Sequence, residues 1–387
     1  MKKSGAVLIA FCFLFKIHAQ TATFNITYSG FTPQAQTAFQ YAADTWGHTI
    51  VSSVPIKVTA HFQLLPAGTL GITFPNGIKN FAGAPAADRW YATSLANSIA
   101  GTELNVGVPD VEMFLSSSTN WYYGTSGTVP AGQYDMVTIV LHELCHGLGF
   151  LSLAKDSTGI GSFGMLRNAD FFNLVSAFPW PNLDTLPSVF DEFLVTNINE
   201  KLDSFPNPST ILSIKLKSNN IYFNGPNAMA ANAGTKPRIY APASFSLGSS
   251  ITHLNEGTYP AGNPNELMTP SGNPAYALHN PGPICIGILK DIGWVINPTL
   301  GVDEMNIRNN EFDFYPNPTT SQIQISNYEL KIKEVKIANT LGELVFQSTI
   351  INRPITINVD VSSLPKGLYF ISVLSNEIQT TQKFIKE

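Results

Sequence analysis

One stretch of the 387-residue chain restricts the fold more than any other. Residues 133–150 carry apolar side chains at helical spacing without an internal proline, which predicts a long helix. This stretch contains His142-Glu-Leu-Cys-His146. Residues four apart lie on one helix face, so both imidazoles can hold one Zn²⁺ while Glu143 reaches a neighbouring water. With 7 His in 387 residues, chance produces the pattern in about half a percent of such chains, so it indicates a metal site.

A catalytic zinc site needs a third protein ligand, and the residues alone leave several open. Gly149 lets the chain leave the helix abruptly, but the position that the shortest return would use is Ser152. The third ligand must therefore come from elsewhere in the chain. The remaining candidates are His48, His61, His253, His279 and a downstream glutamate such as Glu192.

Three segments together resemble the metzincin zinc proteases, most of all their leishmanolysin-like branch. They are HELCHGLGF at 142–150, SITHLNE at 250–256 and NELMTP at 265–270. In that branch an insertion separates the helix from a third histidine, and a Leu-Met-x-Pro turn follows. The resemblance implies His253 as the third zinc ligand and Met268 as the residue beneath the metal. The 107 positions between His146 and His253 make a somewhat long insertion for that branch.

The same resemblance implies an α+β fold and a secreted zinc-dependent endopeptidase, with Glu143 as the general base. The fold would be a metzincin-like catalytic domain, in which a twisted sheet, an active-site helix and a C-terminal subdomain surround the metal. A thermolysin-like Glu192 ligand explains neither Gly149 nor Met268, and His279 follows the Met-turn, where a loop residue is expected. The alternative function is a non-catalytic surface adhesin that keeps the metal site. Glu143 argues against it, because a binding module needs no general base.

Two further expectations come from the resemblance. Val111–Ser116 would be the lower edge strand of the sheet, to which the backbone of a protein or peptide substrate adds as another strand. Cys285 lies on the predicted last helix of the domain, which would pack under the active-site helix and bring Cys285 to Cys145. A disulfide between them is expected, with two buried free thiols as the alternative.

The N-terminus has the pattern of a secretory signal peptide spanning residues 1–19. Lys2 and Lys3 precede an apolar run at 6–15, and Ala19 supplies the small residue before the cleavage point. No later apolar run reaches the ~18–20 residues of a transmembrane helix. Without Lys2, Lys3 and Lys16, 19 basic residues face 27 acidic ones, so nucleic acid is not an expected partner.

Sequence character changes near residue 305, where short alternating strands replace the mixed pattern. They lie at 322–326, 332–339, 344–348, 355–361, 367–374 and 379–386, and they predict a small antiparallel β-sandwich. The expected organisation is therefore a catalytic domain at 20–298, a linker at 299–310 and a C-terminal domain at 311–387. In the first domain, strands are expected at 23–28, 54–65 and 108–116, and a helix from Thr32. Residues 151–250 read as irregular, with short strand-like runs at 211–216 and 221–223 and no assigned elements.

The tail resembles the C-terminal sorting domain of the type IX secretion route of Gram-negative Bacteroidota. The resemblance rests on FDFYPNP at 312–318, NTLGE at 339–343, VSSLPKGLYF at 361–370 and KFIK at 383–386. It implies passage through the periplasm, the type IX machinery as a partner, and a secreted or cell-surface destination. The alternative is a binding sandwich without a sorting role.

Overall fold

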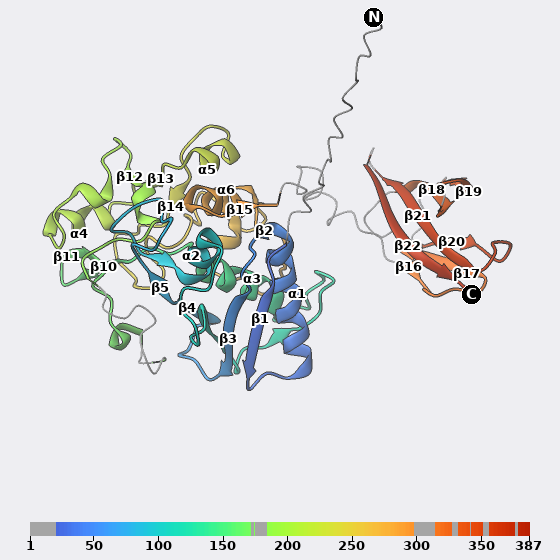
Figure 1. Ribbon diagram of the computed structural model, residues 1–387, viewed down its shortest axis with the longest axis horizontal. Helices are drawn as coiled ribbons and strands as arrows, with labels where there is room; N and C mark the ends of the chain where they lie inside the picture. The colour runs from blue at the N-terminus through green and yellow to red at the C-terminus, as the bar shows by residue number, and fades with distance from the viewer. Residues whose placement is uncertain are drawn as a thin grey trace, which may run out of the picture. The chain divides into compact units, whose positions relative to one another are not determined.

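The computed structural model describes residues 21–171, 174, 184–297, 314–326, 332–340, 342–350, 356–375 and 378–387. The predicted signal peptide at 1–19 and linker at 299–310 lie outside these residues. The chain divides into two compact units, one through Asn297 and one from Pro298 (Figure 1). Over the described residues, no helix combines the length and apolarity needed to cross a membrane.

The first unit is built on a four-stranded sheet in the order β1-β3-β7-β4. β1 (Phe24–Ser29), β3 (Ile56–Gln63) and β7 (Val111–Ser116) are parallel, and β4 (Gly71–Pro75) runs antiparallel to β7. The predicted edge strand Val111–Ser116 is therefore wrong: β7 lies between β3 and β4, and β4 forms the edge. A strand that begins with Gly and ends with Pro gives little strand signal, so the sequence pattern does not reveal β4.

Two helices on this sheet occur where they are predicted. α1 (Pro33–Thr49) begins after Thr32, whose side chain accepts a hydrogen bond from the Ala35 amide. α3 (Met136–Gly147) is shorter than the predicted 133–150, because Asp135 is its N-cap and β9 (Tyr134–Asp135) precedes it. Gly149 has φ of +103°, a conformation that side chains rarely adopt, and it turns the chain out of the helix as expected.

The segment from 150 to 297 supplies most of the remaining elements. The strand-like run at 211–216 forms a helix, because Ser209 caps it through the Leu212 amide. Cys285 lies on the last helix of the unit, as expected. The other elements of this unit are β2 (Ile50–Val51), β5 (Gly77–Ile78), β6 (Tyr91–Ala92), α2 (Thr93–Ala100), β8 (Trp121–Tyr122), β10 (Ala154–Ser157), β11 (Ile160–Phe163), η1 (Asn168–Phe171), η2 (Asp191–Phe193), β12 (Leu194–Thr196), η3 (Leu202–Ser204), α4 (Thr210–Leu216), β13 (Ile221–Phe223), α5 (Pro226–Ala231), β14 (Arg238–Ile239), η4 (Glu266–Met268), α6 (Pro283–Ile292) and β15 (Val295–Ile296).

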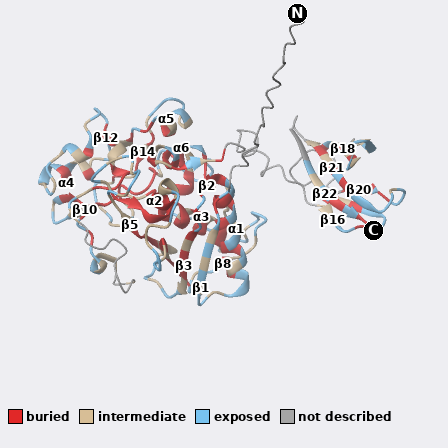
Figure 2. Ribbon diagram, in the orientation of Figure 1, coloured by how far each residue is buried: buried red, intermediate tan, exposed pale blue. Residues whose placement is uncertain are grey.

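The core of the first unit surrounds α3. Ten of its twelve residues are buried, so the helix is enclosed by the sheet, α1 and α6 rather than lying on the surface (Figure 2). The Trp46 indole of α1 donates to the Leu141 carbonyl at 2.9 Å, and the Trp294 indole donates to the Leu148 carbonyl at 2.7 Å. Two buried tryptophans therefore anchor α3 and its C-cap residue through backbone carbonyls.

The second unit is a pair of antiparallel sheets, ordered β16-β17-β20 and β19-β18-β21-β22. The strands are β16 (Phe314–Tyr315), β17 (Gln322–Ser326), β18 (Ile332–Asn339), β19 (Leu344–Thr349), β20 (Thr356–Asp360), β21 (Gly367–Ser375) and β22 (Ile378–Lys386). All six predicted strands are present, and β16 is the one the prediction lacked. The chain as a whole therefore mixes helices and sheets, as expected of an α+β protein.

Candidate metal centre

The structure brings three imidazoles to one point. His142 and His146 project from one face of α3, and His253 arrives from the loop that follows β14. Their Nε2 atoms lie 3.1 Å (His142 to His146), 3.3 Å (His146 to His253) and 3.1 Å (His142 to His253) apart. Among the described residues, these three histidines form a group whose ligand atoms lie close enough together to share one metal ion.

The opposite nitrogen of each ring shows which one holds the proton. Nδ1 of His142 lies 2.6 Å from the Leu267 carbonyl, Nδ1 of His146 lies 2.8 Å from the Phe150 carbonyl, and Nδ1 of His253 lies 2.8 Å from the Ser249 carbonyl. A carbonyl oxygen only accepts, so each Nδ1 carries the hydrogen and donates. In the neutral rings every Nε2 therefore presents a lone pair, and three lone pairs face one another.

Burial keeps the three rings neutral. It lowers the pKa of His142 to about 4 and that of His146 to about 3, and the positive charge of His142 lowers the His146 pKa further. The pKa of His253 also falls well below its ordinary value, first through burial and then through His146 and His142. Neutral imidazole is the form that binds a metal, so the site is in its ligand form at neutral pH.

The geometry fits a zinc ion. Tetrahedral Zn²⁺ with Zn–N bonds of about 2.0–2.1 Å separates neighbouring ligand nitrogens by about 3.3–3.4 Å, close to the 3.1–3.3 Å between these Nε2 atoms. Carbonyl partners on the far nitrogens are the usual supports of metal-binding histidines. Without a cation, three converging lone pairs would only repel.

Glu143 lies beside the imidazoles, in the wall of a cleft of about 990 Å³. Its side chain is buried, and one carboxylate oxygen, Oε2, accepts a hydrogen bond of 2.7 Å from the Thr73 hydroxyl of β4. Burial raises the pKa of Glu143 to about 7, while the Thr73 hydrogen bond opposes the rise. A carboxylate with such a pKa can both accept and release a proton near neutral pH.

The walls of the cleft come from distant parts of the chain. β4 and α3 line it, together with residues from the segments 66–70, 116–120, 151–154, 166–171, 247–253 and 266–278. The non-glycine residue Ile251 has φ of +71°, two positions before His253. Such strained backbone persists only where surrounding contacts enforce it, and here it aims the third imidazole.

The turn at Met268 holds two of the ligands. The carbonyl of Leu267, within η4, fixes His142, and the Leu254 amide, next to His253, donates to the Met268 carbonyl at 2.7 Å. The Met268 side chain is fully buried. This turn joins α3 to the loop that carries the third histidine.

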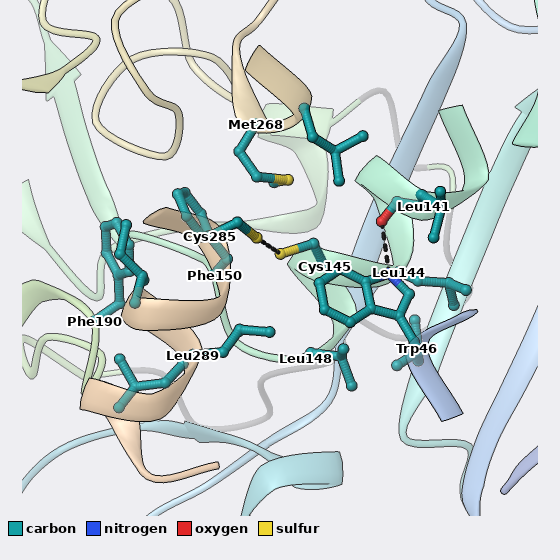
Figure 3. Packing of buried hydrophobic residues seen from close by; sticks show 14 of the residues in the cluster. Trp46, Leu141, Leu144, Cys145, Leu148, Phe150, Phe190, Met268, Cys285 and Leu289 are labelled. Carbon is teal, nitrogen blue, oxygen red and sulfur yellow. Dashed lines mark hydrogen bonds between the residues drawn. The ribbon is translucent and has the colours of Figure 1, made fainter. Parts of the chain in front are cut away.

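Cys145 and Cys285 meet behind α3, as the resemblance implies. Their sulfur atoms are 3.2 Å apart among Met268, Phe150 and Leu289 (Figure 3). Both are buried free thiols in this structure, so the expected contact is present and the bridge itself is not formed. Burial raises the pKa of Cys145 well above its ordinary value, so at neutral pH the side chain is a protonated thiol.

The competing ligands have other partners. His279 contacts the N-cap Asp135 at 2.8 Å, His61 contacts Glu112 at 3.0 Å, and His48 faces the Asp44 carbonyl of its own helix.

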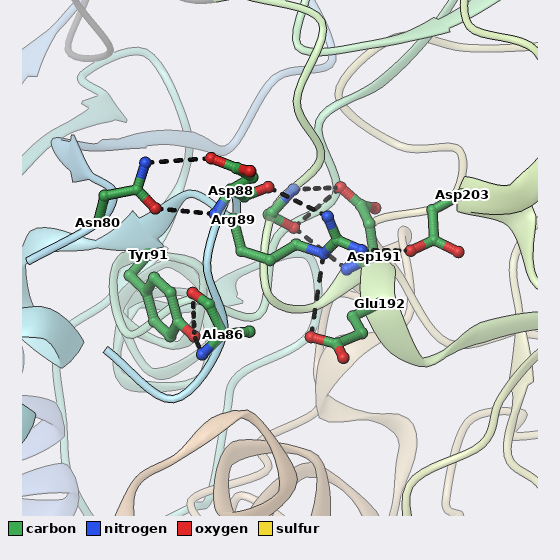
Figure 4. Close-up of polar contacts among 9 residues, drawn as sticks. Asn80, Ala86, Asp88, Arg89, Tyr91, Asp191, Glu192 and Asp203 are labelled. Atoms are coloured by element: carbon green, nitrogen blue, oxygen red, sulfur yellow. Dashed lines mark hydrogen bonds and ion pairs between the residues drawn. The ribbon is translucent and has the colours of Figure 1, made fainter. Parts of the chain in front are cut away.

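Glu192 also has another partner. It pairs with Arg89, 3.9 Å from the guanidinium, and Arg89 also donates to Asp203 at 2.6 Å (Figure 4). This ionic cluster ties the loop after β5 to η2 and η3. Sequence reasoning missed Thr73 altogether, because nothing in its neighbourhood marks a contact made across 70 positions.

Comparison with known proteins identifies the tail. Residues 313–387 match the family model of the secretion system C-terminal sorting domain. A comparison with curated protein sequences found no match. The chain therefore carries a C-terminal sorting domain of the type IX secretion route, and it is exported to the medium or the cell surface.

Two solved structures align with small parts of the chain. A DUF3244 family protein with an immunoglobulin-like β-sandwich fold, from Bacteroides vulgatus, is 17% identical, covers 20% of this chain and 95% of its own, and has a TM-score of 0.17. The CBM51-2 and INT domains of Clostridium perfringens ZmpB are 12% identical, cover 18% of this chain and 16% of their own, and have a TM-score of 0.15. At these scores neither alignment bears on what the chain does.

Proposed function

We propose that the first unit is a zinc-dependent endopeptidase of metzincin type, resembling the leishmanolysin-like branch. The observation that carries the proposal is the convergence of three Nε2 atoms within 3.3 Å, beside a buried glutamate in an open cleft. His142, His146 and His253 are the three ligands that would hold the ion. When bound there, zinc polarises a scissile carbonyl and lowers the pKa of an adjacent water.

Glu143 acts as the general base. Its carboxylate takes one proton from the attacking water as the new carbon–oxygen bond forms, and then delivers that proton to the leaving amine as the carbon–nitrogen bond breaks. Because its pKa is raised to about 7, neither transfer is strongly uphill. The Nδ1 donors of the three histidines remain on their carbonyl partners throughout and hold the rings in place.

Substrate would bind along β4 rather than along β7. The Ser116 amide donates to the Leu70 carbonyl and the Asn76 amide to the Asp110 carbonyl, so hydrogen bonds to β7 recur at every second residue of this strand. The backbone groups of Gly71 and Thr73 point the other way, toward the cleft. An extended peptide can pair with them as an added strand, in line with the notion of strand addition at a sheet edge.

A peptide-cleavage assay on the mature protein tests the proposal. Peptides from a library of varied sequence should be cleaved at internal bonds. A chelator should abolish this cleavage, and added zinc should restore it. Glu143→Gln should reduce the rate by at least about a hundredfold while the metal content stays near one ion per chain. Glu192→Gln, a carboxylate outside the cleft, is the matched control and should leave both unchanged. Metal binding without any cleavage by the wild-type protein would favour the adhesin alternative.

A further inference from the structure

Two positions of the edge strand act on one side chain of the candidate site. In β4, Gly71 and Thr73 are two residues apart and so lie on the same face of the strand. That face meets α3 at Glu143, whereas Ile72 and Phe74 face the opposite side and pack beside Phe114. The carboxylate of Glu143 therefore lies directly against the strand.

Gly71 shows how close this approach is. A Cβ atom built on Gly71 would lie 2.8 Å from both Cγ and Oε1 of Glu143, and 2.9 Å from Cδ. Distances this short do not occur between real side chains, so any larger residue would push the carboxylate away. The strand leaves room for Glu143 only because position 71 has no side chain.

Thr73 supplies the attractive contact. Its hydroxyl donates to Oε2 of Glu143 at 2.7 Å, and the pair is buried. Threonine is β-branched and has few χ1 rotamers, so its hydroxyl is a rigid donor. With Oε2 occupied, Oε1 is the oxygen left to exchange protons.

We propose that Thr73 is a positioning residue that holds Glu143 in its catalytic orientation, in a space that Gly71 keeps open. The inference rests on the proposed peptidase function and adds a residue to it. During turnover the transferred proton moves from water to Oε1 and on to the amine, while Thr73 keeps its own hydrogen. Because the backbone of Gly71 and Thr73 also faces the proposed substrate strand, peptide pairing and base orientation depend on the same two residues of β4.

Kinetics of two Thr73 variants test the role. Thr73→Val keeps the shape and removes the hydroxyl, so kcat should fall by roughly tenfold or more while KM and zinc content stay within twofold. Thr73→Ser restores the hydroxyl and should recover most of the rate. Thr59→Val, a half-buried threonine of β3 in the same sheet, should change nothing. An unchanged kcat in Thr73→Val, or a loss that Thr73→Ser does not repair, would overturn the proposal.

A second measurement needs no activity. In urea unfolding of the zinc-free full chain, Thr73→Val should lower the midpoint in the wild-type background and have a clearly smaller effect in a Glu143→Ala background. Gly71→Ala should likewise destabilise the wild type more than the Glu143→Ala variant. Equal effects in the two backgrounds would refute the contact. Coupling without any peptidase activity would leave the contact standing and reject the proposed function instead.

Discussion

The two units of this chain bury different kinds of side chain. The first unit encloses ionisable groups, among them Asp110, Glu143, His146, Asp191 and His253. Across the described part of the second unit, the buried polar residues are Thr319 and Lys386, and the core consists of aliphatic and aromatic side chains. Burying a polar group costs free energy unless it is hydrogen-bonded, and burying a charge costs more. The core of the second unit is therefore almost entirely apolar, whereas the first unit also buries the groups to which we assign the proposed chemistry.

The buried ionisable groups of the first unit also differ from one another in their hydrogen-bond partners. Asp191 accepts from the Leu153 amide at 3.0 Å and from the amide and hydroxyl of Ser188 at 2.9 Å, so it fastens the cleft wall. The three histidines use one nitrogen each for the scaffold and leave the other toward the cleft. Asp191 therefore bonds only with groups of the surrounding chain, whereas each histidine directs one nitrogen into the cleft, which marks the histidines as candidates for function.

The sharpest test of this contrast is the third ligand. His253→Ala should reduce the zinc content from about one ion per chain to near zero and abolish peptidase activity, because two imidazoles from one helix hold zinc only weakly. His279→Ala should keep both, since His279 pairs with Asp135 instead. Elemental analysis of the dialysed variants checks the prediction. Zinc retained in His253→Ala and lost in His279→Ala would reverse the assignment.

A deletion tests whether the two cores are independent. Removing residues 311–387 should leave a folded, zinc-binding first unit when it is expressed alone, because the two hydrophobic clusters share no residue. In the native host the same deletion should block export, since the sorting domain is absent. Circular dichroism and metal analysis check the first statement, and fractionation of cells and medium checks the second. Normal external levels of the truncated protein would contradict the sorting role.

The cysteine pair offers a smaller effect within the first core. In oxidising medium we expect Cys145 and Cys285 to form a bridge, which would close a loop of 140 positions and stabilise the unit by about 4–5 kcal/mol in the chain-entropy model. Reduction should then lower the melting temperature without removing zinc. Thiol titration of the denatured, unreduced protein decides the matter, and two free thiols per chain would show that the pair only packs. Cys145→Ala with Cys285→Ala serves as the control that reduction cannot affect.

The smallest expected effect is a pH dependence of stability. Burial raises the pKa of Asp191 to about 6, so the folded state holds this proton more tightly than the unfolded state, where the pKa is about 3.9. Protonated Asp191 therefore contributes its full stabilisation of the folded state below about pH 4. As the pH rises to about 6, this contribution is lost and the free energy of unfolding falls by roughly 2–3 kcal/mol. Asp191→Asn should remove this part of the profile.

Only the difference between wild type and Asp191→Asn isolates that group. Asp110 and Glu143 also have raised pKa values and act in the same direction, whereas the histidines, with lowered pKa values, make stability rise with pH. Urea unfolding of the zinc-free proteins at pH 4, 5, 6 and 7 measures the difference. Parallel profiles for the two proteins would show that Asp191 has the same pKa folded and unfolded.

Local patterns predict much of both units. The alternating strands of the tail and the spacing of α3 are set by burial of one face, and the sequence displays this periodicity directly. The segment 211–216 shows the limit: its apolar residues suit a strand, but the Ser209 cap and packing on β11 make it a helix. His253 is implied by a resemblance, and only the structure brings it to His142.

Contacts across the fold have no local signal. β4 is short, begins with Gly71 and ends with Pro75, so the sequence pattern does not reveal it, and the resemblance implies Val111–Ser116 as the edge of the sheet instead. The partnership of Thr73 with Glu143 depends on how an antiparallel strand lies over a helix. Neither residue type nor spacing in one sequence indicates such an arrangement, so the positioning residue becomes visible only in the folded chain.

The turn at Met268 has a consequence for how this chain tolerates change. The Leu267 carbonyl accepts a hydrogen bond from His142, and the Met268 carbonyl accepts one from the Leu254 amide, next to His253. These short contacts set the position of His253 relative to His142. The spacing of the two histidines therefore does not depend on the exact length of the roughly hundred residues between Gly149 and Ile251. The exposed loops of this segment can therefore vary in length between relatives, as long as its buried side chains and its two ends keep their places.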